Sequence, residues 1–189
     1  MPRITLPEPD AMDADQRRVY DKIVSGRRGR IQGPLRAALY NADLADRWQA
    51  LGELLRYNTT LTPRQSELAI LVTGRACQSP FEWYAHRLEA ERIGIEPQVI
   101  EAILARSVPP GLPADEAVIV QVATELNRFK SVTDGTYADA LARLGERRLV
   151  ELTALVGYYT MVAMTLNAHE IPLPDDVRPA FPLPQRELA

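Results

Sequence analysis

Two residues of this chain stand at a spacing that could support proton transfer. Glu82 and His86 are four residues apart, so on a helix their side chains lie on one face within contact distance. A carboxylate that holds an imidazole fixes its tautomer and raises its basicity, which lets the histidine move a proton near neutral pH. The same pair is common on protein surfaces, and Glu82 is also placed to complete a capping box that begins at Ser79.

Glu67 is a third candidate because it leads directly into five apolar residues, 68–72. Such a run would bury every side of that helical turn and draw the carboxylate toward a low-dielectric environment, where it needs a partner. The alternative is an ordinary glutamate in the first turn of its helix, stabilised by the helix dipole and partly exposed to solvent.

The sequence supports a metal site or redox chemistry less well than it supports proton transfer. Glu67, Glu82 and His86 supply two carboxylates and one imidazole, but no second histidine stands at ligand spacing, so we expect no metal site. The chain holds one cysteine and two histidines, which excludes an intramolecular disulfide, a dithiol pair and a three-histidine centre within one subunit. We interpret Cys77 as a small hydrophobic residue near a helix end, and His169 as a cap or packing residue.

The composition predicts a globular protein with one core. Of 189 residues, 46% are hydrophobic and 25% are charged. The net charge of −3 leaves no basic excess that would attract nucleic acid or anionic lipid. The arginines in Arg27 to Arg30 could bind an anion, although a solvated loop is the simpler interpretation. The N-terminal segment lacks the features of a signal peptide, and the uncharged stretch 152–169 is polar for a membrane span, so we expect a cytoplasmic protein with no membrane partner.

The elements that carry these residues are predicted to be helical throughout. Apolar residues follow a helical period and strand-like alternation is essentially missing, so the predicted fold is all-α. Proline-rich stretches predict extended arms at 1–12 and 171–189, around a domain over 13–170. Within that domain, caps, prolines and glycines predict nine helices, at 13–26, 34–40, 43–57, 63–77, 80–93, 97–106, 115–129, 134–144 and 146–168.

Capping signatures fix the starts of two of these helices. In each, a hydroxyl stands three residues before a side chain that can accept from the cap N–H: Thr62 before Gln65, and Ser79 before Glu82. A proline occupies the first helical position in both helices. Gly26 suits a left-handed cap at the end of the first helix.

A weak internal repeat relates two of the apolar helices. The pattern at 67–72 returns at 151–156, at an offset of 84 residues, and each copy has a histidine downstream, at 19 residues for His86 and 18 for His169. The two halves are related by duplication, or two amphipathic helices share the pattern by coincidence. The sequence leaves both open.

Several short blocks of the chain form a recognisable set. They are Gly33-Pro34, 44–52, 61–64, 67–72, 82–86 with Gly94, 149–152 and Tyr158-Tyr159. Together they resemble the carboxymuconolactone decarboxylase family, whose superfamily also contains alkylhydroperoxidase D, over about residues 31–172. The resemblance implies a single-domain helical bundle of the alkylhydroperoxidase D-like type that forms homotrimers or hexamers and works without an organic cofactor.

The resemblance also separates two branches of the superfamily. In the peroxidase branch, a glutamate, a Cys-x-x-Cys pair and a histidine form a relay. Matching that pattern places Glu67 on the glutamate and His86 on the histidine, while Ser79 and Glu82 fall at the cysteines. Both thiols are missing, and Cys77 stands two residues too early to replace the first, so the dithiol reaction lacks its nucleophile. The chain therefore resembles the branch without the cysteine pair, to which the lactone decarboxylases belong.

The resemblance implies a carboxy-lyase that acts on a small cyclic carboxylic acid or lactone. Loss of carbon dioxide leaves electron density that must spread into a lactone carbonyl and then be protonated, which calls for a proton donor in a dry pocket. We predict His86 as the acid, oriented by Glu67 or Glu82. The predicted substrate contacts are Trp83, Ser79 and Arg75. Isomerisation or hydration of a similar substrate needs the same parts.

Two other functions stay open at this point. The chain could be a helical oligomer whose pocket binds a small molecule without turning it over, or, as a third hypothesis, a peroxidase that depends on Cys77. The apolar circumference of 152–169 predicts an obligate homo-oligomer in each case, because one small subunit offers limited surface to cover it.

The sharpest prediction is geometric. Glu67 should meet Glu82 and His86 in one pocket, because the turn around Gln78 and Ser79 is too short for anything but adjacent packing of two helices. The carboxylates would raise the pKa of His86 above its ordinary value of ~6.5, and burial would lower it. A distance above ~8 Å between the Glu67 carboxylate and the imidazole would exclude the proton relay.

Overall fold

The structure is a computed structural model that describes residues 2–27, 29–31 and 33–182. That part of the chain contains α-helices and one 3-10 turn and no β-strand, which confirms the all-α prediction. The helices are α1 (Ala14–Ser25), α2 (Pro34–Ala38), α3 (Ala42–Tyr57), α4 (Pro63–Ala76), α5 (Pro80–Arg92), α6 (Pro97–Leu104), α7 (Ala114–Phe129) and α8 (Asp134–Ala168).

The last element, α8, contains the break that was expected at Gly145. Two separate helices were expected to meet at Gly145, and both lie within α8. Gly145 has φ 73° and ψ 167°, values that only glycine adopts readily, so the backbone kinks there and continues as a helix on both sides. The predicted break is therefore present, and the 35 residues of α8 consist of two helices joined by a kink at Gly145.

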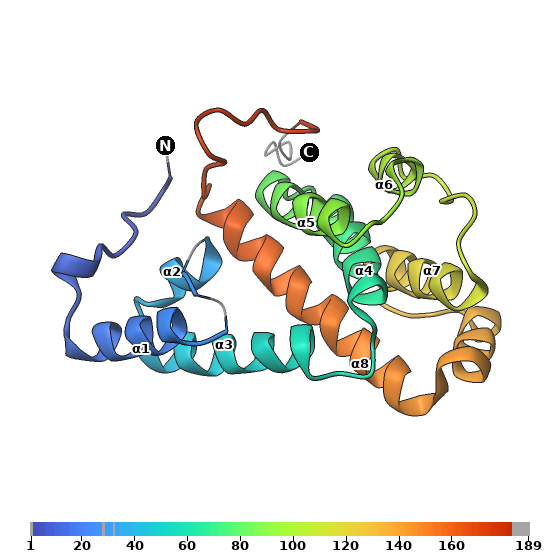
Figure 1. Cartoon of the computed structure of the whole chain (residues 1–189), viewed down its shortest axis with the longest axis horizontal. Coiled ribbons are helices and arrows are strands. Elements are labelled where there is room, and N and C mark those ends of the chain that lie inside the picture. The colour runs from blue at the N-terminus through green and yellow to red at the C-terminus, as the bar shows by residue number, and fades with distance from the viewer. Residues whose placement is uncertain (1, 28, 32, 183–189) are drawn as a thin grey trace.

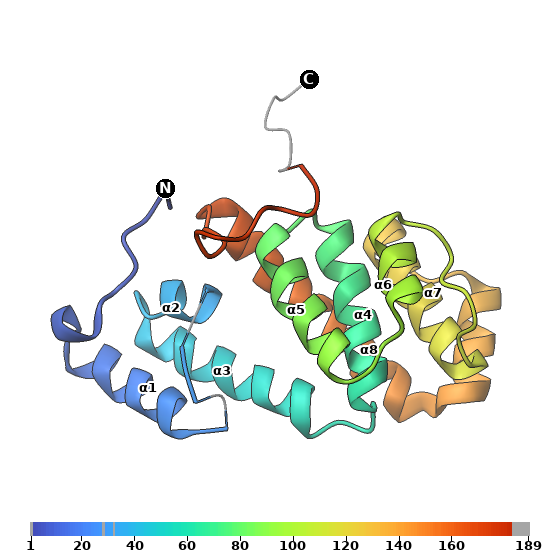
Figure 2. The same ribbon diagram turned by 45° about the horizontal axis from the view of Figure 1, so that its top comes forward.

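Helix α4 lies at the centre of the bundle. It packs against α5, α7 and α8, while α1 to α3 lie to one side and α3 runs beside α8 (Figure 1). In the turned view α5 lies beside α4, and both α5 and α6 pack against α4 (Figure 2). Because α4 has neighbours around it, its residues from Gln65 to Gly74 are all buried, and this explains the unbroken apolar run at 68–72.

The predicted caps have different outcomes. The Thr62 hydroxyl accepts from the N–H of Gln65, whose side chain accepts in return from the N–H of Thr62, so α4 begins with the expected capping box. The Ser79 side chain makes no cap hydrogen bond, so the capping box predicted for α5 is wrong. Gly26 has φ −80°, so α1 does not end in the expected left-handed cap.

The two arms are largely without helix. The N-terminal arm holds a 3-10 turn at Pro9–Ala11, which the prediction of an extended segment missed. Residues 171–182 contain no helix, and residues 183–189 of the predicted arm lie outside the described residues.

Helix α8 is long and apolar enough, by length and composition, to cross a membrane. Half of its most apolar window is buried inside the fold, where α8 packs against α4 and α7. This is the placement expected of the core helix of a globular bundle.

Candidate active site

A histidine lies between two carboxylates where α4 and α5 pack together. His86 Nδ1 is 2.6 Å from Glu67 Oε2, and His86 Nε2 is 3.0 Å from Glu82 Oε1. The convergence expected from the sequence is therefore present, well within the ~8 Å limit set for a relay. The side chains of Glu82 and His86 meet because they stand four residues apart on α5, and Glu67 reaches them from α4.

The turn between α4 and α5 brings Glu67 close to His86. Gln78 has a positive φ of 49°, and the N–H of Ser79 donates to the carbonyl of Gly74, so the chain reverses within a few residues. Glu67, Glu82 and His86 are 5%, 4% and 7% exposed. The alternatives of a partly solvated first-turn Glu67 and a capping Glu82 do not hold, because both carboxylates are buried against the imidazole.

The carboxylates favour the charged form of the imidazole. Burial lowers the pKa of His86, but the charge and hydrogen bonds of Glu67 and Glu82 outweigh it and raise the pKa from the ordinary 6.5 to about 9. A protonated imidazole carries an N–H on each nitrogen, so it donates to both carboxylates at once. At neutral pH the cluster therefore stores a proton on His86.

Arg56 brings a second positive charge to the cluster from α3. Its Nη2 lies 3.9 Å from Glu67 Oε1, and the guanidinium is mostly shielded from solvent. Arginine stays protonated in proteins, so two carboxylates face one imidazolium and one guanidinium. The charges of the buried cluster cancel, which is the condition for keeping ions in a low-dielectric interior.

Two tyrosines of α8 close the site on the other side. The ring of Tyr159 meets His86 edge to face, with 4.9 Å between ring centroids, and Tyr158 meets Tyr159 in the same way at 5.3 Å. Burial raises the pKa of Tyr159 well above its ordinary value, so its phenol stays neutral. The tyrosines restrict the imidazole and keep its surroundings dry.

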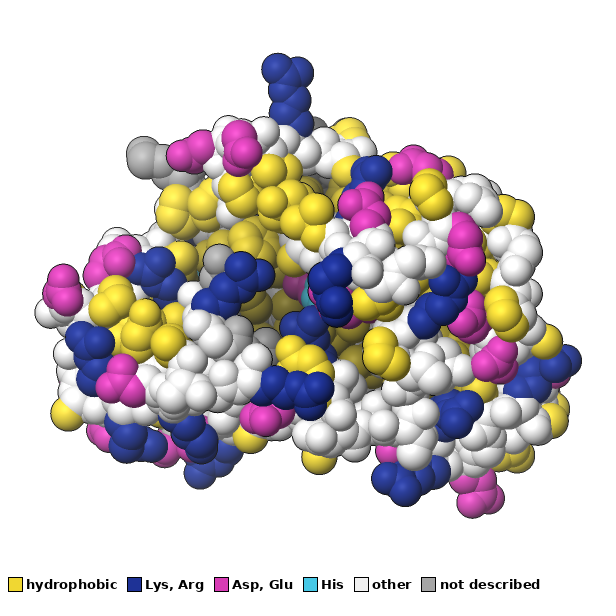
Figure 3. Space-filling model, viewed as in Figure 1, with side chains coloured by type: hydrophobic (Ala, Val, Ile, Leu, Met, Phe, Trp, Pro, Cys, Tyr) yellow, Lys and Arg dark blue, Asp and Glu magenta, His cyan; other side chains and the backbone are white. Residues whose placement is uncertain are grey.

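A cavity of about 320 Å³ opens beside the cluster. Glu82 and His86 line it, and Glu67 does not, so the inner carboxylate supports the histidine while the outer one faces the cavity. Figure 3 shows this face of the molecule hollowed between α3 and α5, with Lys and Arg side chains around the hollow. The other lining residues are Arg30, Pro34, Leu35, Arg56, Tyr57, Phe81, Ala85, Glu89, Tyr158, Tyr159 and Val162.

The three residues predicted to contact a substrate do not line this cavity. Trp83 is 1% exposed and packs edge to face against Phe181, because it follows Glu82 directly on α5 and so points to another side of the helix. Ser79 is fully buried and lines a cavity beside the C-terminal segment. Arg75 lines another cavity, between α4, α6 and α7. Their expected contact with a substrate beside His86 is therefore corrected.

Sequence reasoning missed several residues that do line the cavity. Arg56 comes from α3, and no local pattern ties it to Glu67 eleven residues later. Tyr158 and Tyr159 were part of the family resemblance but were given no role there, although that resemblance was the one signal that could have placed them at the site. In the arginine-rich loop, Arg30 lines the cavity and Arg27 stacks on Tyr57 at 4.2 Å, while Arg28 lies outside the described residues.

Cys77 is placed as a packing residue. Its Sγ contacts Asn127 Oδ1 at 3.8 Å, the side chain is partly buried, and it does not line the His86 cavity. Burial raises the pKa of the thiol, which favours its protonated form. Within the described ranges, no group of three or more His, Cys, Asp or Glu side chains is arranged to hold a metal ion.

Comparisons with known proteins agree with this architecture. Residues 42–125 match the sequence model of the carboxymuconolactone decarboxylase family. A peroxidase-related protein from Ralstonia eutropha JMP134, described as an alkylhydroperoxidase AhpD core, has a TM-score of 0.76 at 14% identity over 93% of each chain. A peroxidase-related protein from Silicibacter sp. TM1040 has a TM-score of 0.76 at 16% identity over 93% of each chain.

A third solved structure, the debrominase Bmp8 in complex with 2,3,4-tribromopyrrole, has a TM-score of 0.74 at 11% identity over 92% of this chain and 91% of that chain. No curated protein matches the sequence. At these identities the solved structures share the fold, and the family match covers the helices that carry Glu67, Glu82 and His86. Residues 42–125 of the chain therefore resemble the carboxymuconolactone decarboxylase family, and the fold is that of alkylhydroperoxidase D-like proteins.

Proposed function

We propose that this chain is an enzyme that transfers a proton to or from a small cyclic carboxylic acid or lactone, without an organic cofactor. The observation that carries the proposal is the buried row of Glu67, His86 and Glu82, which ends at a cavity. A histidine with a pKa of about 9 holds a proton at neutral pH, and the carboxylate beside it faces the space where a substrate would bind.

The geometry suggests that Glu82 and Glu67 have different roles. Both imidazole nitrogens are engaged, so the proton on Nε2 reaches the cavity through Glu82 rather than directly. Glu67 stays behind the ring and stabilises its charged form, as an inner carboxylate does in other acid–base sites. Arg56 and Arg30 line the cavity and supply the positive charge that a substrate carboxylate would seek.

Decarboxylation fits these parts in a balanced sequence. The bond between the substrate carbon and its carboxylate breaks, its electron pair moves into the conjugated lactone carbonyl, and carbon dioxide leaves. His86 passes its proton to the Glu82 carboxylate, which delivers it to the carbon, and a proton from solvent then returns His86 to its charged form. Isomerisation would use the same two residues, with Glu82 first removing a proton, so we propose carboxy-lyase activity as the leading member of this group.

The proposal is tested with a panel of lactone acids and cyclic carboxylic acids. Wild-type protein should turn over at least one of them, and His86→Ala and Glu82→Gln should each reduce kcat by about 100-fold or more, the typical contribution of a positioned acid or base. His169→Ala is the matched control, because that histidine lies outside the cavity, and it should keep full activity. Equal activity in wild type and His86→Ala would refute the mechanism.

The two alternatives give different results in the same experiments. If wild-type protein turns over no acid while members of the panel still raise its melting temperature, the chain is a small-molecule-binding protein. Peroxide reduction that is lost in Cys77→Ser would instead establish the peroxidase. Two observations argue against that outcome: burial raises the pKa of the partly buried thiol, and Cys77 does not line the cavity.

We also propose that the chain works in the cytoplasm as a homo-oligomer, a trimer or hexamer. Leu44, Leu51 and Leu54 of α3 are each about half exposed, and Met164 of α8 is 62% exposed. Large apolar side chains in this number, on two long helices, suit an interface between subunits. Light scattering at micromolar concentration should give a mass of three or six chains, and a stable monomer would contradict it.

A further inference from the structure

A second cavity, between α4, α6 and α7, shares no lining residue with the His86 cavity. Its volume of about 530 Å³ lies in the range of ~300 to 1,000 Å³ that small-molecule sites occupy. Apolar side chains form most of its wall, among them Val72, Ile103, Leu112 and Val120. The cavity is therefore large enough for a small organic molecule with an apolar body.

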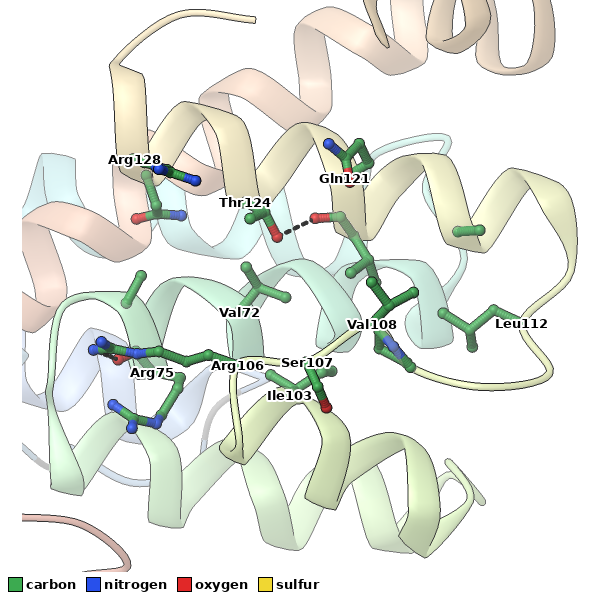
Figure 4. A pocket seen from close by; sticks show the side chains of 15 residues that line it. Val72, Arg75, Ile103, Arg106, Ser107, Val108, Leu112, Gln121, Thr124 and Arg128 are labelled. Atoms are coloured by element: carbon green, nitrogen blue, oxygen red, sulfur yellow. Dashed lines mark hydrogen bonds between the residues drawn. The ribbon is translucent and has the colours of Figure 1, made fainter.

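Three arginines gather at one end of this cavity. Arg75 and Arg128 lie in the last turns of α4 and α7, and Arg106 follows the end of α6. Figure 4 shows all three at the same end, away from Leu112 at the other. Among the ion pairs of the described residues, none involves these arginines.

The contacts of Arg75 and Arg106 position these two arginines without neutralising them. Arg75 Nε donates to the carbonyl of Leu104 at 2.7 Å, and its guanidinium stacks on Phe181 with 4.6 Å to the ring centroid. Arg106 Nη2 donates to the carbonyl of Arg75 at 3.4 Å. Burial lowers the pKa of Arg75, and the charge of the nearby Arg106 lowers it further.

Helix dipoles offset only part of this charge. The C-terminal end of a helix carries about half a negative charge, so the ends of α4, α6 and α7 together supply about −1.5 against three guanidinium groups. The excess of about +1.5 is enough to balance the charge of one carboxylate or sulfonate. Guanidinium groups bind carboxylates, sulfonates and phosphates through paired N–H donors, which makes such a group the complement of this end.

We propose that this cavity is a binding site for a small amphipathic anion, an apolar ring or chain that bears one carboxylate, sulfonate or phosphate. The anionic group lies among Arg75, Arg106 and Arg128, and the apolar body lies against Val72 and Leu112. Arg75, predicted from the sequence to contact a substrate beside His86, thereby binds an anion in a separate site. This proposal does not depend on the reaction at His86.

The probe for the test is 8-anilino-1-naphthalenesulfonate, a fluorescent anion with an aromatic body, and the matched neutral compound is N-phenyl-1-naphthylamine. Fluorescence titration should show that wild-type protein binds the sulfonate about tenfold or more tightly than the neutral compound. Arg106→Gln, on an exposed residue, should weaken binding of the sulfonate by about tenfold and leave the neutral compound unchanged. Arg143→Gln, at an exposed arginine of α8 paired with Asp139, is the control and should bind like wild type.

Three outcomes would overturn the proposal. The first is equal affinity for the sulfonate and the neutral compound, and the second is unchanged sulfonate binding in Arg106→Gln. The third is loss of binding in Arg56→Gln, which would place the probe in the His86 cavity. A circular dichroism melt of each variant shows that it is folded, so that a change in binding reports the site.

Discussion

Glu67 on α4 and Glu151 on α8 precede similar apolar runs, and each has a histidine 18 or 19 residues downstream. Between Glu67 and His86 the chain turns, so α5 folds back on α4 and the two side chains come within 2.6 Å. Between Glu151 and His169 the chain continues as one helix, and 18 residues of helix span about 27 Å. The turn at Gln78 is therefore what brings Glu67 and His86 into contact, whereas Glu151 and His169, which have no such turn between them, stay apart.

The two glutamates also differ in the donors that hold them. Glu151 accepts from the N–H and the hydroxyl of Thr60, and its other oxygen accepts from Arg147. These donors keep their protons near neutral pH, so Glu151 remains an anion that ties the segment before α4 to α8. The donor at Glu67 is an imidazole, whose proton can leave. Glu151 therefore stabilises the fold, whereas Glu67 is suited to proton transfer.

The largest expected effect is on stability after removal of the imidazole. His86→Ala leaves Glu67 and Glu82 buried without the cation between them, and breaking a buried charged pair costs about 3 to 5 kcal/mol. Urea unfolding at pH 7 and fixed protein concentration measures the loss. Adding Glu82→Gln to this variant should restore part of the stability, because one unpaired charge is removed. A loss below about 1 kcal/mol would show that the cluster relaxes or is hydrated.

The sequence could predict this cluster because its parts are local. The four-residue spacing on α5 and the short turn after α4 both follow from neighbouring residues, as do the helix starts at Pro63 and Pro80. Arg56 and Tyr159 could not be found in this way, because they reach the site through packing of α3 and α8. Trp83 and Arg75 were misplaced for a related reason, since the direction of a side chain depends on which helix covers each face.

A second prediction concerns how the protonation of His86 makes stability depend on pH. The pKa of His86 is raised in the folded state, so its contribution to stability is fully present below about pH 6.5 and is lost as the pH rises through about 9. The shift corresponds to about 3 kcal/mol across that window. Urea unfolding at pH 6 and pH 9.5 should show this loss in wild type and in His169→Ala. A His86→Gln variant has no proton to lose there and should show a flat dependence.

Glu151 gives a smaller effect, on the acid side. Burial raises the pKa of Glu151, but the hydrogen bonds from Thr60 outweigh it and lower the pKa below 4.5. Its contribution is present above pH 4.5 and is lost as the pH falls. Glu151→Gln should therefore cost about 1 to 2 kcal/mol at pH 7 and less near pH 3. Its activity should match wild type, whereas Glu67→Gln should reduce it.

The smallest expected effect concerns the turn itself. Gln78 adopts a left-handed backbone with φ 49°, which costs a residue with a side chain about 1 kcal/mol. Gln78→Gly removes that cost and should leave stability unchanged or raised by up to about 1 kcal/mol, after the entropy that glycine loses on folding. Gln78→Val places a β-branched side chain in the same conformation and should lower stability more than Gln78→Ala. Since the turn holds α5 against α4, the loss in Gln78→Val should be matched by a fall in the pKa of His86, followed by NMR titration of its ring. An unchanged titration in a destabilised variant would show that helix packing, rather than the turn, keeps the imidazole between its carboxylates.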